Sequence, residues 1–199
     1  MEVELARPYG FCSGVRRIIG LVERALQEGP IYSLGEPIHN PGEVARLREL
    51  GLVIVDRLAG LPQDGRGRRF LVRAHGISPE VRGEVERRGY RIIDGTCPLV
   101  AAAHRDAPRP GEEGFQLVIV GHRAHPEGQG ILGEVAVAEV VLGPEELQVQ
   151  RGERLGVISQ TTQLPERFAA VVAAAALGAR ELRAINTLCR ETELRQGAT

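Results

Sequence analysis

Apolar positions along the chain follow two alternating patterns, one typical of strands and one typical of helices. Short runs such as "LVIV" at 52–55 and "QLVIVG" at 116–121 are almost entirely apolar, as are strands buried on both faces of a parallel sheet. Between such runs, apolar residues recur three to four positions apart, as they do on one face of a helix. The clearest helical segment is 14–28, with Val15, Ile18, Ile19, Val22 and Leu26.

This alternation predicts a regular series of elements. The expected strands are 3–7, 30–35, 52–55, 70–76, 90–95, 116–121, 137–143, 154–160 and 181–186. The expected helices are 14–28, 42–50, 79–88, a segment that follows Cys97 and is ended by Pro108 and Pro110, 128–133, 144–147 and 165–177. Strands that alternate with helices imply an α/β fold with parallel sheets. We expect two such α/β lobes.

Composition narrows the class of protein. The chain has 199 residues, is 43% hydrophobic and 26% charged, and carries a net charge of −1. This balance gives no reason to expect binding to nucleic acid or to an anionic membrane. No apolar run approaches the roughly 20 residues that span a bilayer, and the first residues do not resemble a signal peptide. We therefore expect a cytoplasmic protein. All 25 basic residues are arginine, which excludes mechanisms that use a Schiff-base lysine or a P-loop lysine.

The three cysteines occupy equivalent places in the predicted pattern. Cys12, Cys97 and Cys189 each follow a predicted strand and precede a helical segment, and they recur at nearly domain-sized intervals. Because ligands in open α/β sheets bind beyond the carboxyl ends of the strands, we expect the three sulfur atoms to converge on one site. A helix N-terminus also favours the thiolate, which is the form that binds metals.

A single cysteine in such a place would be a small buried hydrophobic residue, but three in the same setting favour metal binding. An odd number also makes a disulfide framework improbable in a protein expected to be cytoplasmic. Thiolates suit iron–sulfur clusters or zinc, and the chain lacks the C-x-x-C pair typical of structural zinc sites. Three thiolates leave one iron of a four-iron cluster open, and an open iron is a catalytic site.

Three histidines at strand ends predict an anion site. His39, His75 and His125 lie near Gly, Pro or Asn residues in loops, and together with "SQTTQ" at 159–163 they are expected to form a polar ring. Such a ring fits an anion with several oxygens, such as phosphate. Glu127 is the carboxylate of this ring and therefore its natural proton donor.

The other two histidines are interpreted differently. His104 lies in the helix after Cys97, and we expect it to have a structural role. His122 precedes His125 in the same loop, and for His122 the structural and functional interpretations are about even.

Six motifs occur in the order found in one enzyme family. They are "GFCSGV", "HNPGEV", "AHGIS", "DGTCPLV", "GHRAHPEG" and "SQTT". In these motifs, which together extend over nearly the whole chain, the sequence resembles the 4-hydroxy-3-methylbut-2-enyl diphosphate reductases, terminal enzymes of the non-mevalonate isoprenoid pathway. The resemblance implies removal of the allylic hydroxyl of that small-molecule diphosphate with two electrons and two protons. The products would be isopentenyl and dimethylallyl diphosphate.

The resemblance also implies roles for individual residues. A [4Fe–4S] cluster would be held by the three cysteines, Cys12, Cys97 and Cys189. The diphosphate would be surrounded by three histidines, His39, His75 and His125. Glu127, backed by the Thr161 hydroxyl, would deliver protons. Electrons would come from a ferredoxin- or flavodoxin-type donor.

Members of this family usually have three α/β lobes, so the resemblance implies two lobes related by pseudo-symmetry and the stub of a third. We predict the first lobe at 1–96, the second at 97–188 and the third-lobe segment at 189–199, with the strand at 3–7 assigned either to the first lobe or to the third. A separate chain or an oligomer is expected to complete the third lobe.

Two alternatives remain open. The chain could be a non-catalytic or partner-dependent iron–sulfur-binding relative of the family, or an α/β phosphate-binding module whose cysteines are incidental. The histidines and Glu127 argue against a cluster carrier, because a carrier needs no proton donor. The recurrence of the cysteines argues against the module.

Overall fold

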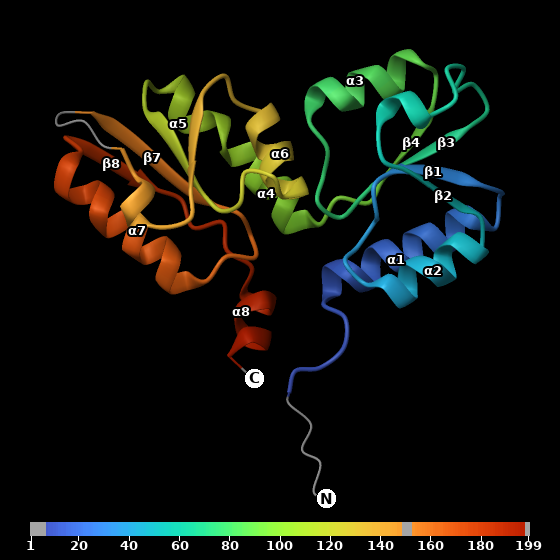
Figure 1. Ribbon diagram of the computed structural model, residues 1–199, viewed down its shortest axis with the longest axis horizontal. Coiled ribbons are helices and arrows are strands. Elements are labelled where there is room, and N and C mark those ends of the chain that lie inside the picture. Colours follow the sequence, from blue (N-terminus) through green and yellow to red (C-terminus); the bar gives the residue numbers. More distant parts are fainter. Residues whose placement is uncertain (1–6, 149–152, 198–199) are drawn as a thin grey trace, which may run out of the picture. The chain divides into compact units, whose positions relative to one another are not determined.

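The computed structural model describes residues 7–148 and 153–197, which form two compact units, each built on a four-stranded sheet (Figure 1). The first is Ser13–Pro98, called here the 13–98 unit. The second, called the 99–197 unit, contains the described residues from Leu99 onward together with residues 7–12.

The sheet of the 13–98 unit is parallel, with the strand order β2-β1-β3-β4. Its strands are β1 Ile31–Leu34, β2 Leu52–Val55, β3 Arg69–Val72 and β4 Arg91–Asp94. Its helices are α1 Ser13–Leu26, α2 Pro41–Glu49, the 3-10 helix η1 Leu58–Gly60 and α3 Pro79–Arg87. The connections from β1 and β3 turn to opposite sides of the sheet. The carboxyl ends of these two inner strands therefore form the switch point at which ligands bind in open α/β sheets.

Alternate residues of β3 show that helices cover both faces of this sheet. Leu71 belongs to a core with Ile18 of α1 and Leu47 of α2. Its neighbour Phe70 belongs to a second core with Val85 of α3. Successive side chains of a strand point to opposite faces, so Phe70, Leu71 and Val72, which are buried on the two faces, are all apolar. Each such side chain contributes about 1.5–3 kcal/mol of burial free energy.

The sheet of the 99–197 unit is also parallel and repeats the same arrangement, with the order β6-β5-β7-β8. Its strands are β5 Gln116–Val120, β6 Ala138–Val141, β7 Arg154–Ser159 and β8 Glu181–Ala184. Its helices are α4 Pro98–Asp106, α5 Pro108–Glu112, α6 Pro126–Gly133, the 3-10 helix η2 Pro144–Glu146, α7 Pro165–Gly178 and α8 Arg190–Gln196. The inner strands are β5 and β7, so the switch point lies at their carboxyl ends.

Helices cover both faces of this second sheet as well. Val118 of β5 packs in a core with Val171 of α7. Ile119, the next residue of β5, packs in another core with Ala103 of α4 and Ile131 of α6. The apolar run at 116–121 is thus explained by burial on both faces.

Three helices begin directly after loops that leave inner strands, and a side chain caps each of them. Asn40 Oδ1 accepts a hydrogen bond from the Glu43 N–H (2.9 Å) at the start of α2. Ser78 Oγ accepts one from the N–H of the third helical residue (3.3 Å) at the start of α3. His125 Nδ1 accepts one from the Glu127 N–H (3.2 Å) at the start of α6. Such caps fix the first turn of a helix, and here they also fix the loops before it.

The prediction of an α/β fold with two parallel sheets is confirmed. The predicted strand at 3–7 lies outside the described residues apart from Arg7, which is in a bend. Pro108 and Pro110 were expected only to end a helix. They do follow the end of α4, but Pro108 also begins the short helix α5, because proline fits a first helical turn. The predicted lobe boundaries stay a prediction. Among the described helices, none combines the length and the apolar character that a membrane crossing requires.

Candidate functional site

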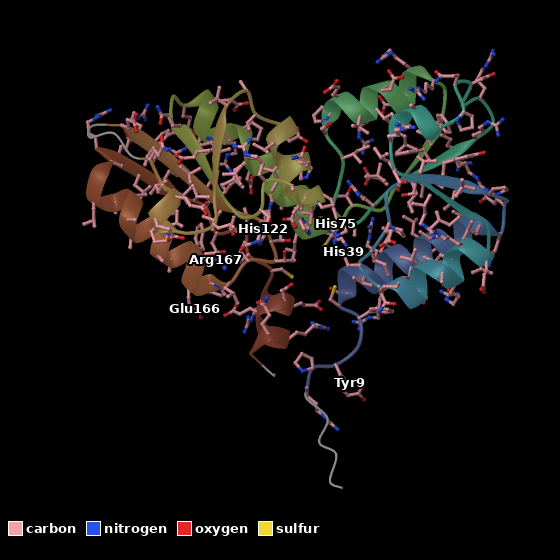
Figure 2. The ribbon with its side chains drawn as sticks, in the orientation of Figure 1. Tyr9, His39, His75, His122, Glu166 and Arg167 are labelled. Atoms are coloured by element: carbon pink, nitrogen blue, oxygen red, sulfur yellow. The ribbon has the colours of Figure 1, made fainter. Side chains whose placement is uncertain are left out.

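Two of the predicted site histidines meet at the switch point of the 13–98 unit. His39 follows β1 and His75 follows β3, and their ring centroids are 4.3 Å apart. The Ala74 N–H donates to the Pro37 carbonyl (3.1 Å) and ties the two loops together. His39 is exposed and His75 is partly buried. Figure 2 shows the two labelled side chains next to each other.

Cys97 lies beside the same pair of loops. Its N–H donates to the carbonyl of Ala74 (3.0 Å), the residue before His75. The turn before Cys97 is fixed by Asp94, whose Oδ1 accepts from the N–H (3.0 Å) and the hydroxyl (2.6 Å) of Thr96. Cys97 then precedes α4, which begins at Pro98. The 13–98 unit thus brings three predicted site residues, His39, His75 and Cys97, to one edge of its sheet.

In the 99–197 unit, Glu127 is buried and held by Thr161. Glu127 lies in the first turn of α6 and is only 1% exposed. The Thr161 N–H donates to its Oε1 (2.6 Å), and the Thr161 hydroxyl donates to its Oε2 (3.1 Å). Burial raises the pKa of Glu127 above its ordinary value, although the two bonds from Thr161 oppose this change. Glu127 therefore keeps its proton to higher pH than a glutamate on the surface.

His125 is linked to the same carboxylate through the backbone. As the cap of α6, it accepts a hydrogen bond from the Glu127 N–H. This bond leaves Nε2 as the ring nitrogen that carries the proton when the ring is neutral. The predicted anion-binding histidine and the predicted proton donor are therefore fixed by one helix start.

Gln160 holds the loop that carries both residues, and sequence reasoning named it only as part of "SQTTQ". Its amide pairs with the backbone of His122, accepting from the N–H (3.0 Å) and donating to the carbonyl (2.7 Å). Gln160 is 1% exposed. A Cβ added at Gly121 or Gly128 would lie within 2.3 Å of the Gln160 side chain. These two glycines were the signal that a large side chain passes there. The His122 side chain itself is exposed, and the structure assigns it no role.

Cys189 lies beside Thr161 in the 99–197 unit. Its N–H donates to the Thr161 carbonyl (2.7 Å). Two residues earlier, the Thr187 hydroxyl accepts from the Ser159 N–H (2.9 Å) and donates to the Ser159 carbonyl. The segment before α8 therefore runs along the end of β7. Cys189, Thr161 and Glu127 consequently lie at one edge of this sheet.

The remaining predicted residues fall outside these two groups. Cys12 directly precedes α1, and the neighbouring Gly10 carbonyl accepts a hydrogen bond from Arg195 of α8 (3.4 Å). His104 is buried in α4 and its Nδ1 lies 3.0 Å from Glu134 Oε1, which fits the structural role predicted for it.

The cysteines suit a thiolate-bound metal centre by their chemistry and their setting. None of the three forms a disulfide, and all are partly buried. Each directly precedes a helix, namely α1, α4 or α8. Three such donors without a fourth fit a cluster that keeps one coordination position open.

Comparison with known proteins gives consistent matches. A family model described as LytB protein matches residues 3–199. A protein of Aquifex aeolicus named 4-hydroxy-3-methylbut-2-enyl diphosphate reductase is 38% identical over 207 residues, which cover 98% of this chain and 69% of the relative. A protein of the same name from Azoarcus sp. is 41% identical over 87% of this chain and 56% of the relative. The chain thus spans between about half and about two thirds of the length of these curated relatives.

Solved structures agree with these matches. A structure titled (E)-4-hydroxy-3-methyl-but-2-enyl diphosphate reductase, the terminal enzyme of the non-mevalonate pathway, has a TM-score of 0.81 and 37% sequence identity. The match covers 98% of this chain and 71% of the chain in that structure. The E-1-hydroxy-2-methyl-but-2-enyl-4-diphosphate reductase of Plasmodium falciparum has a TM-score of 0.84 and 28% identity, with 94% of this chain and 60% of that one covered.

Proposed function

Because the chain belongs to the LytB protein family, we propose that it acts as a reductase of 4-hydroxy-3-methylbut-2-enyl diphosphate. The observation that carries this proposal is the Glu127 carboxylate, which is buried and held at both oxygens by Thr161, the residue whose carbonyl accepts the Cys189 N–H. A thiol and a proton-carrying acid at one sheet edge suit a reaction that needs both electrons and protons. A protein that only carries a cluster would gain nothing from the buried acid.

The diphosphate is bound by His39, His75 and His125 in this proposal. All three lie in loops at the carboxyl ends of inner strands, where ligands bind in open α/β sheets. His39 and His75 are already adjacent, so one phosphate group can accept hydrogen bonds from both rings. His125 has its Nδ1 occupied by the helix start and offers Nε2 to the ligand.

Cys12, Cys97 and Cys189 hold a [4Fe–4S] cluster in this proposal, since cysteines outside disulfides at the starts of helices suit thiolate ligation. When bound, the cluster supplies electrons one at a time and an electrophilic iron that polarises the C–O bond. Arg17 of α1 donates to the Thr96 carbonyl (3.2 Å) and thereby fixes the turn that carries Cys97.

Glu127 supplies the proton that the leaving hydroxyl requires. Expulsion of hydroxide from an allylic carbon is slow unless the oxygen is protonated, and a positioned acid accelerates such steps about 100-fold or more. Burial raises the pKa of Glu127, so its carboxyl group keeps the proton to a higher pH than an exposed glutamate does. Two electrons and two protons then convert the C–OH group into C–H and one molecule of water. Thr161 orients the carboxyl group through its two hydrogen bonds.

The partners and location of the protein are further parts of the proposal. A ferredoxin- or flavodoxin-type protein is proposed as the electron donor, and the cytoplasm as the location.

Anaerobic purification followed by an activity assay tests the proposal. We expect a brown protein with about four irons per chain that converts the hydroxymethylbutenyl diphosphate into isopentenyl and dimethylallyl diphosphate when a chemical reductant is supplied. A colourless protein without iron would contradict the cluster and favour the phosphate-binding module. A protein loaded with iron that binds the substrate but forms no product would contradict reductase activity of this chain and favour the non-catalytic or partner-dependent relative.

A further inference from the structure

Arg73 occupies the switch point of the 13–98 unit together with the two histidines. It directly follows β3 and precedes His75 by two residues. Its Nη1 reaches across to the end of β1 and would lie 2.5 Å from a Cβ added at Gly35. Gly35 has a φ of +73°, and its missing side chain makes room for the guanidinium. Arg73 therefore lies over the carboxyl ends of both inner strands.

Arg73 is partly buried and, within the described residues, lacks the partners that two other arginines of this unit have. Arg69 is bonded to Glu28 and to two backbone carbonyls, and Arg88 is bonded to Glu84 and to the Leu58 carbonyl. In the described part of the chain, Arg73 Nε is buried without a hydrogen-bond partner, and no carboxylate forms an ion pair with this side chain. An unpaired buried charge is costly.

Burial lowers the pKa of Arg73, which is the direction expected for a cation withdrawn from water without a nearby anion. Arginine nevertheless stays charged at any physiological pH. The side chain therefore holds a permanent positive charge that no carboxylate of the described residues pairs with.

We propose that Arg73 is a further anion-binding residue of this site, which pairs with an oxygen of the phosphate group bound by His39 and His75. This inference rests on the proposed function and extends it. A guanidinium presents two parallel N–H donors that match two oxygens of one phosphate. The negative charge of the anion would compensate the positive charge of Arg73. Binding would then offset the free-energy cost of burying this side chain.

A purely structural role for Arg73 and the proposed anion-binding role predict different effects of its removal on the melting temperature of the ligand-free protein. If the side chain supports the loop after β1, its removal lowers the melting temperature of the ligand-free protein. If it awaits an anion, replacing it with an apolar residue removes an unpaired charge, and the melting temperature of the ligand-free protein stays the same or rises.

Binding of inorganic diphosphate to the anaerobically purified, iron-loaded protein tests this inference. The variants are Arg73→Met, which removes the charge, and Arg73→Lys, which keeps the charge but loses the fork of donors. The matched control is Arg66→Met, an 83% exposed arginine of the same unit paired with Asp64. Calorimetric titration should show that Arg73→Met weakens diphosphate binding about tenfold or more. Arg73→Lys should weaken it less, and the control should leave it within about twofold.

Each other result overturns the inference in a recognisable way. Unchanged diphosphate binding by Arg73→Met overturns it and leaves the proposed reductase standing. A melting temperature of ligand-free Arg73→Met far below that of the control, or failure of this variant to fold while Arg73→Lys folds, shows a structural role and overturns it as well. Failure of the wild-type protein to bind diphosphate contradicts both this inference and the proposed function.

Discussion

Burial and hydrogen bonding act in opposite directions on the ionisation of Glu127. It is almost completely buried, and donors from one residue, Thr161, hold both of its oxygens. Burial alone would force a permanent proton onto the carboxyl group, whereas the two donors stabilise the ionised form. The result is a raised pKa with the charged form still supported. A group that must release a proton and take it back needs both conditions.

Replacing Glu127 with glutamine should abolish most of the turnover while sparing the site. Glutamine keeps the shape, and its oxygen can still accept from the Thr161 N–H, but an amide cannot deliver the proton. We expect turnover with a chemical reductant to fall about 100-fold or more, with iron content and substrate binding unchanged. The control is Glu166→Gln, at an exposed glutamate in the first turn of α7 (Figure 2). Retained turnover in Glu127→Gln would defeat the proposed proton transfer.

The same substitution should change how stability depends on pH. The pKa of Glu127 is raised above 4.5 in the folded protein. Its contribution to stability is therefore fully present below the pKa of the unfolded chain and is lost as the pH rises through the folded pKa. The free energy of unfolding of the wild type, relative to Glu127→Gln, should fall as the pH rises from about 4 to neutral. Urea unfolding at several pH values measures this difference.

Glu43 provides a control of opposite sign for this pH series. Its hydrogen bond with Arg46 lowers the pKa of Glu43. The stability that Glu43 adds is present above the unfolded pKa and is lost as the pH falls. The free energy of unfolding of the wild type, relative to that of Glu43→Gln, should therefore increase as the pH rises. If Glu127→Gln shows this same slope, the carboxyl group of Glu127 is not held in the protonated form by burial.

At the scale of elements, the end of β7 is joined to the loop between β5 and α6. Gln160 binds the backbone of His122, and the next residue, Thr161, binds Glu127. Gly128 allows this contact, because a Cβ there would meet Gln160 Nε2 at 2.3 Å and the His122 carbonyl at 2.6 Å. The position of Glu127 thus depends on Gly128, whose neighbours leave no space for a side chain.

Two glycine-to-alanine substitutions in helices should have opposite effects. Gly128→Ala in α6 places a methyl group against Gln160 and backbone, and it should lower the free energy of unfolding by about 1–3 kcal/mol. Gly83→Ala in α3 meets nothing within 4 Å and should raise it by about 0.5–1 kcal/mol, because alanine favours the helix. Denaturant unfolding of both variants measures the difference. A stabilising Gly128→Ala would show that α6 moves away from Gln160 at little cost.

The sequence predicts the elements better than the contacts that cross between them. Apolar runs identify β5 and β7 because burial on both faces requires them. The adjacency of His39 and His75 also follows from their places after predicted strands, as the structure shows. No local sequence pattern predicts the hydrogen bonds of Gln160 or the position of the Arg73 side chain. Gln160 follows β7 but binds the loop after β5, and Arg73 follows β3 but reaches the end of β1. Only the glycines facing them, such as Gly35, mark these contacts in the sequence.

At the scale of the whole molecule, the residues proposed to hold the cluster come from both units. Cys97 belongs to the 13–98 unit, whereas Cys12 and Cys189 belong to the 99–197 unit. If the three thiols bind one cluster, as proposed, the loss of one ligand should remove most of the iron. We expect Cys97→Ser and Cys189→Ser each to lose most of the iron, and the double variant to lose little more. Losses that add in the double variant would indicate independent iron sites. Anaerobic iron and sulfide analysis measures both.

Both sheets place the loops of the candidate histidines, Glu127 and Thr161 after inner strands, and this has a consequence for how the protein loses its structure. Backbone amides of an inner strand are bonded to neighbours on both sides, so they open only when the sheet opens, whereas edge strands such as β2 and β6 can fray alone. Hydrogen exchange should therefore be slowest in β1, β3, β5 and β7. The loops anchored there persist through local opening, so ligand binding and the sheet that carries it disappear in the same cooperative step.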